Sequence, residues 1–227
     1  MTVTREMGFA DIPELYGRMT GDEKHEWAAA STLPVLWVLY DRVLDVAPDR
    51  VDDPRRDRFL LSKGHGPMAY YAVLAAKGFL DPSLLDTWTA WDSPLGLHPD
   101  RVLVPGVEIG SGSLGHGLPI AVGTALGLGL QGGDQRVVVL VGDGELDEGS
   151  NHEAIALATR LHVTNLTAIA VDNSSASHGW PGGIANRFAV EGWHATTVDG
   201  RDHDALHAAL TARQDGPNAV VATIREA

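Results

Sequence analysis

The sequence contains no cysteine among its 227 residues, which excludes disulfides, thiolate metal sites and a cysteine nucleophile. It is also poor in basic residues, with 17 lysines and arginines against 30 aspartates and glutamates, so that its formal net charge is -13. A surface of that sign cannot neutralise the phosphates of nucleic acid. A small anion such as a diphosphate is still a suitable ligand, because backbone amides and a metal ion bind it locally.

Long hydrophobic runs are absent as well. No charge-free apolar stretch approaches the roughly 18 residues of a membrane span, and the N-terminal MTVTREMGF lacks the apolar core of a signal peptide. We therefore expect a cytoplasmic protein without a membrane segment. The length suits one large domain, which we place at residues 25–227, with residues 1–24 as an N-terminal appendage.

Near-continuous apolar segments alternate with helical patterns along the chain. Strands are expected at the start of 58–66 and at 136–141, 166–171, 195–198 and 219–224. Helices are expected at 31–46, 67–77, 118–130, 148–161 and 203–213. Such alternation predicts an α/β fold in which a parallel sheet carries helices on both faces.

The segment VVVLVGDGELDEGS at 137–150 ends a buried strand in Gly-Asp-Gly. By itself this is a common turn, and Asp143 is equally suited to capping the next helix. Asn173 ends the following apolar strand thirty residues later, so a right-handed crossover places both residues at the carboxyl ends of parallel strands. Their oxygens suit Mg²⁺, and the Gly144 amide is then available to a diphosphate.

Gly-Asp-Gly followed about thirty residues later by Asn resembles the thiamine diphosphate signature. Four segments, of which one contains this Gly-Asp-Gly, resemble the N-terminal half of transketolases, especially the separate N-terminal subunits of split transketolases: FLLSKGHGPMAYYAVLAAKGF, PGVEIGSGSLGHGLPIAVG, GDGELDEGSNHEAIALA and GWHATTVDGRDHDAL. The resemblance spans roughly residues 25–224. It implies the thiamine diphosphate-binding α/β fold and transfer of a two-carbon ketol unit from a sugar phosphate donor to an aldose acceptor.

The resemblance also implies roles for individual residues. The Mg²⁺ ligands would be Asp143, Asn173 and the backbone carbonyl of Ser175. The other cofactor-binding residues would hold the diphosphate or, through their backbone, the aminopyrimidine; they are His65, Gly144, Gly112, Ser113 and Leu114.

Three residues would serve catalysis. His98 in LHPD matches a histidine near the reacting hydroxyls of the substrate, where an imidazole transfers protons. His25 occupies the place of another family histidine, although it stands in KHEWA rather than GHPGG. Glu148 matches an acid that connects the two active sites, and it is equally suited to the first turn of a helix. The neighbouring Glu145 is expected to be a solvated charge.

The family needs a glutamate from a pyrimidine-binding domain, for which the 227 residues leave no room. We therefore expect this domain on a partner chain in an α₂β₂ assembly, and we expect this chain to be inactive alone. The segment SSASHG at 174–179 replaces a pattern like KLQIDG, which favours an unusual sugar in a specialised biosynthetic pathway. Two alternatives stay open: the α subunit of another thiamine diphosphate enzyme, such as a 2-oxoacid dehydrogenase or carboligase, and a degenerate partner-binding module.

Overall fold

The computed structural model describes residues 7–20, 26–176 and 178–225. Within these residues five strands form one parallel sheet in the order β1-β2-β3-β5-β4. The strands are β1 Arg58–Leu61, β2 Val137–Gly142, β3 Leu166–Asp172, β4 His194–Asp199 and β5 Asn218–Thr223. All five predicted strands are therefore confirmed to within one or two residues.

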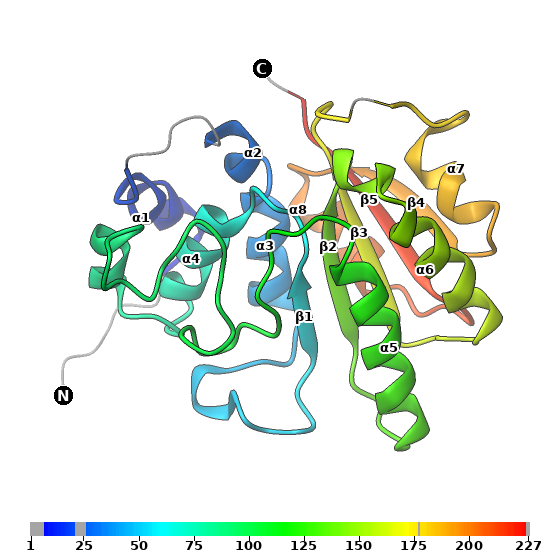
Figure 1. The fold of residues 1–227 in the computed structure, drawn as a ribbon, viewed down its shortest axis with the longest axis horizontal. Helices are drawn as coiled ribbons and strands as arrows, with labels where there is room; N and C mark the ends of the chain where they lie inside the picture. The colour runs from blue at the N-terminus through cyan, green and yellow to red at the C-terminus, as the bar shows by residue number, and fades with distance from the viewer. Residues whose placement is uncertain (1–6, 21–25, 177, 226–227) are drawn as a thin grey trace.

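Helices cover both faces of the sheet (Figure 1). One face carries α5 Gly117–Leu130, α6 Gly149–Arg160 and α7 Gly183–Ala189. The other side carries α3 Leu33–Val38, α4 Pro67–Ala76 and α8 His203–Thr211, and α1 Ile12–Gly17 and α2 Glu26–Ala30 pack against α4. Short 3-10 turns lie at Phe9–Asp11, Pro48–Arg50, Pro82–Thr87 and Gly144–Asp147.

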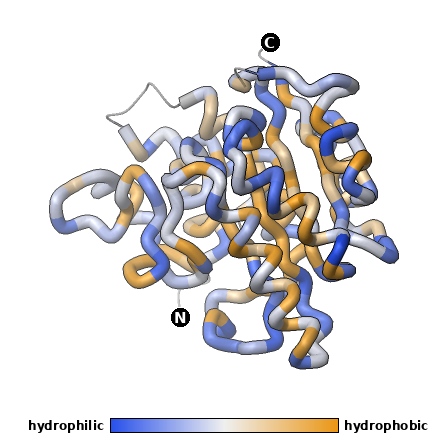
Figure 2. The backbone as a smooth tube through the Cα atoms, turned by 45° about the vertical axis from the view of Figure 1, so that its right-hand side comes forward, coloured by the Kyte–Doolittle hydropathy of each residue, from blue (hydrophilic) through white to orange (hydrophobic). Residues whose placement is uncertain are grey.

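The side chains of β2 show why the sheet needs two layers of helices. All six residues of the strand are buried. Val138 and Leu140 belong to the core beneath α3 and α4, whereas Val139 and Val141 belong to the core beneath α5 and α6. Figure 2 shows the same concentration of hydrophobic residues in the central strands. A strand that is apolar on both faces must be covered on both, so the predicted fold class is confirmed.

The direction of each crossover decides which face its helix covers. The chain moves across the sheet in one direction from β1 through β2 and β3 to β4, and α5, α6 and α7 lie on one face. The return from β4 to β5 runs in the opposite direction, and α8 lies on the other face. Right-handed crossovers require this change of face. Within the described residues no helix combines the length and hydrophobicity needed to cross a membrane.

Two parts of the N-terminal region differ from the expectation. The predicted helix at 31–46 is shorter: α3 passes into a π-helical turn at Leu39–Val43, and Leu44 is extended. The segment expected to be an appendage contributes to the main core, where four of its side chains are buried, namely Ile12, Leu15, Tyr16 and Met19. The described part of that segment thus packs as part of the domain.

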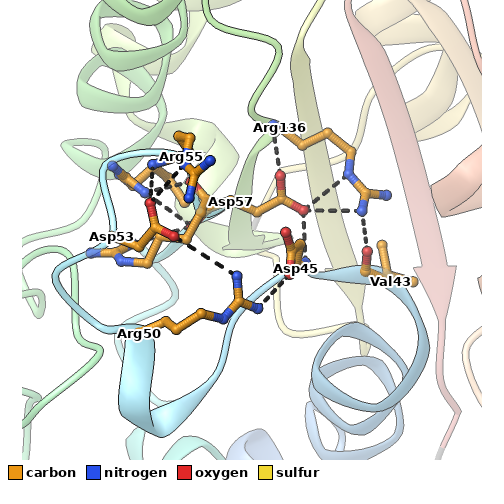
Figure 3. A network of polar contacts seen from close by, with 9 residues as sticks. Val43, Asp45, Arg50, Asp53, Arg55, Asp57 and Arg136 are labelled. Atoms are coloured by element: carbon orange, nitrogen blue, oxygen red, sulfur yellow. Dashed lines mark hydrogen bonds and ion pairs between the residues drawn. The ribbon is translucent and has the colours of Figure 1, made fainter.

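A buried carboxylate, Asp57, connects three segments at the amino ends of β1 and β2 (Figure 3). It accepts hydrogen bonds from the backbone amide of Asp45 at 2.9 Å and from the amide and Nε of Arg136 at 2.9 and 3.1 Å. The same guanidinium donates to the carbonyl of Val43. These contacts draw the backbone away from the helical path after Val43, which explains the early helix end.

Replacing Asp57 by Ala should lower the free energy of unfolding by about 2 to 3 kcal/mol, the usual value of hydrogen bonds to a buried charged group. Urea denaturation of the purified chain measures the change. Asp52→Ala is the matched control, because Asp52 is an exposed aspartate of the same loop. Equal stabilities for the two variants would contradict the role given to Asp57.

Candidate functional site

The Gly-Asp-Gly turn lies where β2 ends beside β3. The amide of Asp143 donates to the carbonyl of Val171 at 3.1 Å, which continues the parallel ladder by one residue. Asp143 is only 2% exposed. Its carboxylate accepts hydrogen bonds from the amides of Gly144, Ser175 and Ala176 at 2.9, 2.7 and 3.1 Å, and from the Ser175 hydroxyl at 2.5 Å. The structure therefore brings Asp143 and Ser175 together.

Asn173 lies at the end of β3 and is 7% exposed. Its Nδ2 donates to the Ser31 hydroxyl at 3.1 Å, and that hydroxyl donates to the carbonyl of Ala28. The amide oxygen Oδ1 is buried and accepts no hydrogen bond from the described residues. A buried oxygen without a donor is costly, and a hard cation is a ligand that satisfies it.

The donor set at this point suits a metal shared with a charged ligand. The described residues contain no group of three or more His, Asp or Glu side chains that could hold a metal ion. One carboxylate, an amide oxygen and a carbonyl oxygen match the preference of Mg²⁺ for few protein oxygens plus phosphate oxygens. A Cβ on Gly144 would lie 3.6 Å from the Ser175 carbonyl oxygen, so a larger side chain there would fill the space beside these oxygens.

Two glycine segments approach each other beside this turn. A Cβ on Gly64, in the loop after β1, would lie 3.0 Å from the Leu114 side chain and 3.7 Å from the Gly112 carbonyl oxygen. Gly112 has φ of +120°, and a Cβ there would lie 2.7 Å from the ring of His98. The loop at 64–66, the loop at 112–117 and His98 therefore meet at one place, although they are far apart in sequence.

A small pocket opens between the segment at 64–68, α2 and the loop that carries His98. Its lining consists of Ala29, Gly64, His65, Pro67, Met68, Leu97 and His98. It brings together His65 and His98, two of the expected site histidines, and both are exposed. Ser113 and Leu114 are exposed as well. His25, the third expected histidine, lies outside the described residues.

Glu148 lies at the start of α6 as the residue before its first turn. Its side chain is exposed, and its Cβ lies 2.7 Å from the place that a Cβ on Gly115 would take. The position agrees with the preference for an acid at a helix N-terminus. Glu148 is not among the residues that line the pocket, so the structure does not bring it together with His65 and His98.

The sequence did not predict that two charged residues near Asp143 are buried. Glu145, expected to be solvated, is 3% exposed, and Lys63 is 6% exposed. Burial lowers the pKa of Lys63 to about 8, although the negative charges of Asp143 and Glu145 act to raise it. Burial also raises the pKa of Glu145, although its hydrogen bonds act in the other direction. No sequence pattern separates Glu145 from the acids that follow it, because all belong to one short acidic segment.

Comparison with known proteins shows the family. Residues 20–224 match the family described as "Transketolase, thiamine diphosphate binding domain". The chain belongs to this transketolase family. The match covers every strand of the sheet and both glycine loops, and it confirms the resemblance inferred from the motifs.

Relatives of the transketolase domain differ in length. The chain is 58% identical over 221 residues to "Ferredoxin fas2" of Rhodococcoides fascians, covering 96% of this chain and 73% of that protein. It is 43% identical over 145 residues to a protein of Actinobacillus succinogenes named as one subunit of an apulose-4-phosphate transketolase, covering 64% and 52%. A transketolase structure from Pichia stipitis superposes with a TM-score of 0.83 at 27% identity, covering 95% of this chain and 35% of the other.

The contact between Gly112 and His98 gives a test of the site geometry. Gly112→Ala should lower the free energy of unfolding by about 1 to 3 kcal/mol, because φ of +120° disfavours a Cβ and His98 occupies its place. Gly123→Ala is the control, since a Cβ there meets nothing within 4 Å and lies inside α5. It should raise stability by about 0.5 to 1 kcal/mol. If urea denaturation showed that the free energy of unfolding changes in the same direction in both variants, the described loop conformation would be contradicted.

Proposed function

We propose that this chain is the thiamine diphosphate- and Mg²⁺-binding component of a two-component transketolase. The observation that carries the proposal is the buried, unpartnered Oδ1 of Asn173 at the same edge of the sheet as the contact between Asp143 and Ser175. Such an oxygen next to a buried carboxylate at the carboxyl end of a parallel sheet is where α/β proteins hold a metal and a phosphorylated ligand. The family match supports thiamine diphosphate as that ligand.

The roles of the residues follow from their places. Asp143, Asn173 and the Ser175 carbonyl would hold Mg²⁺, while Gly144 and His65 would bind the diphosphate. Gly112, Ser113 and Leu114 would contact the aminopyrimidine through their backbone. When bound, thiamine diphosphate supplies the carbon nucleophile that accepts a two-carbon unit from a ketose. His98, at the pocket, would move protons at the sugar hydroxyls.

A partner chain would complete the site. The residues His65, His98, Ser113 and Leu114 are all exposed, so this chain would provide one wall of the cofactor site. Two curated relatives that are 43% and 37% identical carry names that describe them as one subunit of a transketolase. The partner would supply the pyrimidine-binding domain and its glutamate in an α₂β₂ assembly, and its surface would cover the exposed side chains of Leu97 and Leu114.

The substrate would be a sugar or sugar phosphate of a specialised pathway. By their names, relatives act on apulose-4-phosphate and on 6-deoxy-6-sulfo-D-fructose. In this chain the segment after Asn173 carries an exposed histidine, His178, in place of the acid expected from the family pattern. That change replaces an expected acid by a histidine in the segment that follows Asn173, and it supports a substrate other than the common pentose phosphates.

The two alternative functions have less support. The family matched over residues 20–224 is that of transketolases, which disfavours a 2-oxoacid dehydrogenase or carboligase subunit. A degenerate module has no need to keep both a buried carboxylate and an unpartnered amide oxygen at the turn. Both observations favour an intact cofactor site.

Asp143→Asn should weaken binding of thiamine diphosphate with Mg²⁺ at least about 100-fold, because even changes outside the metal's own ligands cost about 10- to 100-fold. Asparagine keeps one acceptor oxygen but turns an NH₂ group toward donors on the other side, so the thermal midpoint should fall as well, and the affinity is compared at a temperature at which both variants are folded. Calorimetric titration of each variant, mixed with its partner chain, measures the affinity for thiamine diphosphate with Mg²⁺. Asp147→Asn removes the same charge from the same turn and should bind normally; an unchanged affinity in Asp143→Asn would contradict the metal assignment.

The same titration tests the partner. Thiamine diphosphate with Mg²⁺ is added to this chain alone and to its mixture with a chain carrying a pyrimidine-binding domain. Tight binding in the mixture only is the expected result. Saturable binding in neither sample would support the degenerate module instead.

A further inference from the structure

We propose that Glu145 is a positioning residue that anchors the glycine loop at 112–117 to the ends of β1 and β2. The inference deepens the proposed function, because this loop is the segment expected to receive the aminopyrimidine. Glu145 itself lies outside the pocket lining and would act through the loop. Its side chain would thereby set the distance between the two ends of the cofactor site.

Three hydrogen-bond donors from separate segments converge on the Glu145 carboxylate. Oε1 accepts from the Gly115 amide at 3.0 Å and from the Ser62 hydroxyl, and Oε2 accepts from the Gly142 amide at 3.2 Å. The donors come from the loop before α5, the residue after β1 and the last residue of β2. A buried acid with three donors from three segments fixes their relative positions.

Ser62 extends the anchor to the first residue of α5. Its hydroxyl oxygen accepts a hydrogen bond from the Gly117 amide at 3.0 Å while donating to Glu145. A Cβ on Gly117 would lie 2.3 Å from Cβ and Oγ of Ser62, so the helix start lies directly against the end of β1. The loop is thus held at Gly115 and again at Gly117.

The peptide groups of Gly115 are held from two sides. Its amide donates to Glu145, and its carbonyl accepts from the Ser150 hydroxyl at 2.6 Å. A segment with several glycines has a large conformational freedom in the unfolded chain, and fixing it costs more than fixing other residues. Side-chain anchors at one residue therefore decide which conformation the loop adopts.

The anchor requires a carboxylate rather than an amide. All three groups around Glu145 donate, and a carboxylate accepts at both oxygens. Glutamine would present an NH₂ group to at least one of these donors. Lys63, whose side chain runs along Gly142, provides the positive charge that offsets the buried carboxylate.

This arrangement couples the two ends of the expected cofactor site. Gly142 immediately precedes Asp143, which lies at the metal and diphosphate end, whereas Gly115 immediately follows Leu114 at the aminopyrimidine end. One buried side chain contacts both. A ligand that occupies only the diphosphate end should therefore depend less on Glu145 than one that spans the site.

The first test is hydrogen exchange of the Gly115 and Gly117 amides in the full chain, followed by NMR. In Glu145→Gln the Gly115 amide, and through Ser62 the Gly117 amide, should exchange about tenfold faster, which corresponds to the loss of one hydrogen bond. The amides of residues 137–141 and of β3, which do not contact Glu145, should keep their rates. Asp147→Asn is the matched control, because it neutralises a half-buried acid of the same turn. Unchanged exchange at the two glycines, or equal acceleration across the sheet, would overturn the proposal.

The second test compares two ligands on the chain assembled with its partner: thiamine diphosphate and inorganic pyrophosphate, each with Mg²⁺. Glu145→Gln should weaken thiamine diphosphate about tenfold and pyrophosphate clearly less. Equal losses for the two ligands would show a general structural role and overturn the proposal. If the wild-type assembly binds neither ligand, the proposed function fails, and the exchange rates alone decide whether Glu145 anchors the loop.

Discussion

The parallel pairing of β2 with β3 is the constraint on which the candidate site depends. Because the two strands run side by side in register from Val137 opposite Leu166 to Gly142 opposite Val171, their carboxyl ends stop at the same edge. The chain leaves β2 at Asp143 and β3 at Asn173, so residues thirty positions apart become neighbours. The loop after Asn173 then folds onto the Asp143 carboxylate through two backbone amides and a hydroxyl.

Burial of charge beneath this edge is the second feature of the molecule. Asp143, Glu145 and Lys63 are each less than a tenth exposed, although such residues rarely lie inside a protein without partners. Two acids close together would repel each other, and the lysine between the strand ends offsets part of that repulsion. Hydrogen bonds from backbone amides supply the remaining compensation. The site thus rests on buried polar groups that are held by hydrogen bonds at the ends of β1 and β2.

The part of the site formed by the histidines and the glycine loop is exposed rather than buried. Its histidines and the tip of the glycine loop are exposed, while the Gly112 backbone is packed against His98. An active site normally excludes water from the reacting groups. The exposed wall therefore agrees physically with a chain that covers about a third of a complete transketolase and whose relatives are named as single subunits.

The sequence by itself determined the strands, the fold class, the family and the two residues that directly follow β2 and β3, because apolar runs and glycine motifs are local patterns. It also placed His65 and His98 among the candidates, and they share a pocket. Only the tertiary structure decided that Glu145 and Lys63 are buried, that Asn173 keeps a free amide oxygen, and that the helical segment stops at Val43, next to the contacts of Asp57. Each of these depends on contacts between segments far apart in the chain, such as Asn173 with Ser31, and no local pattern records which side chain meets which.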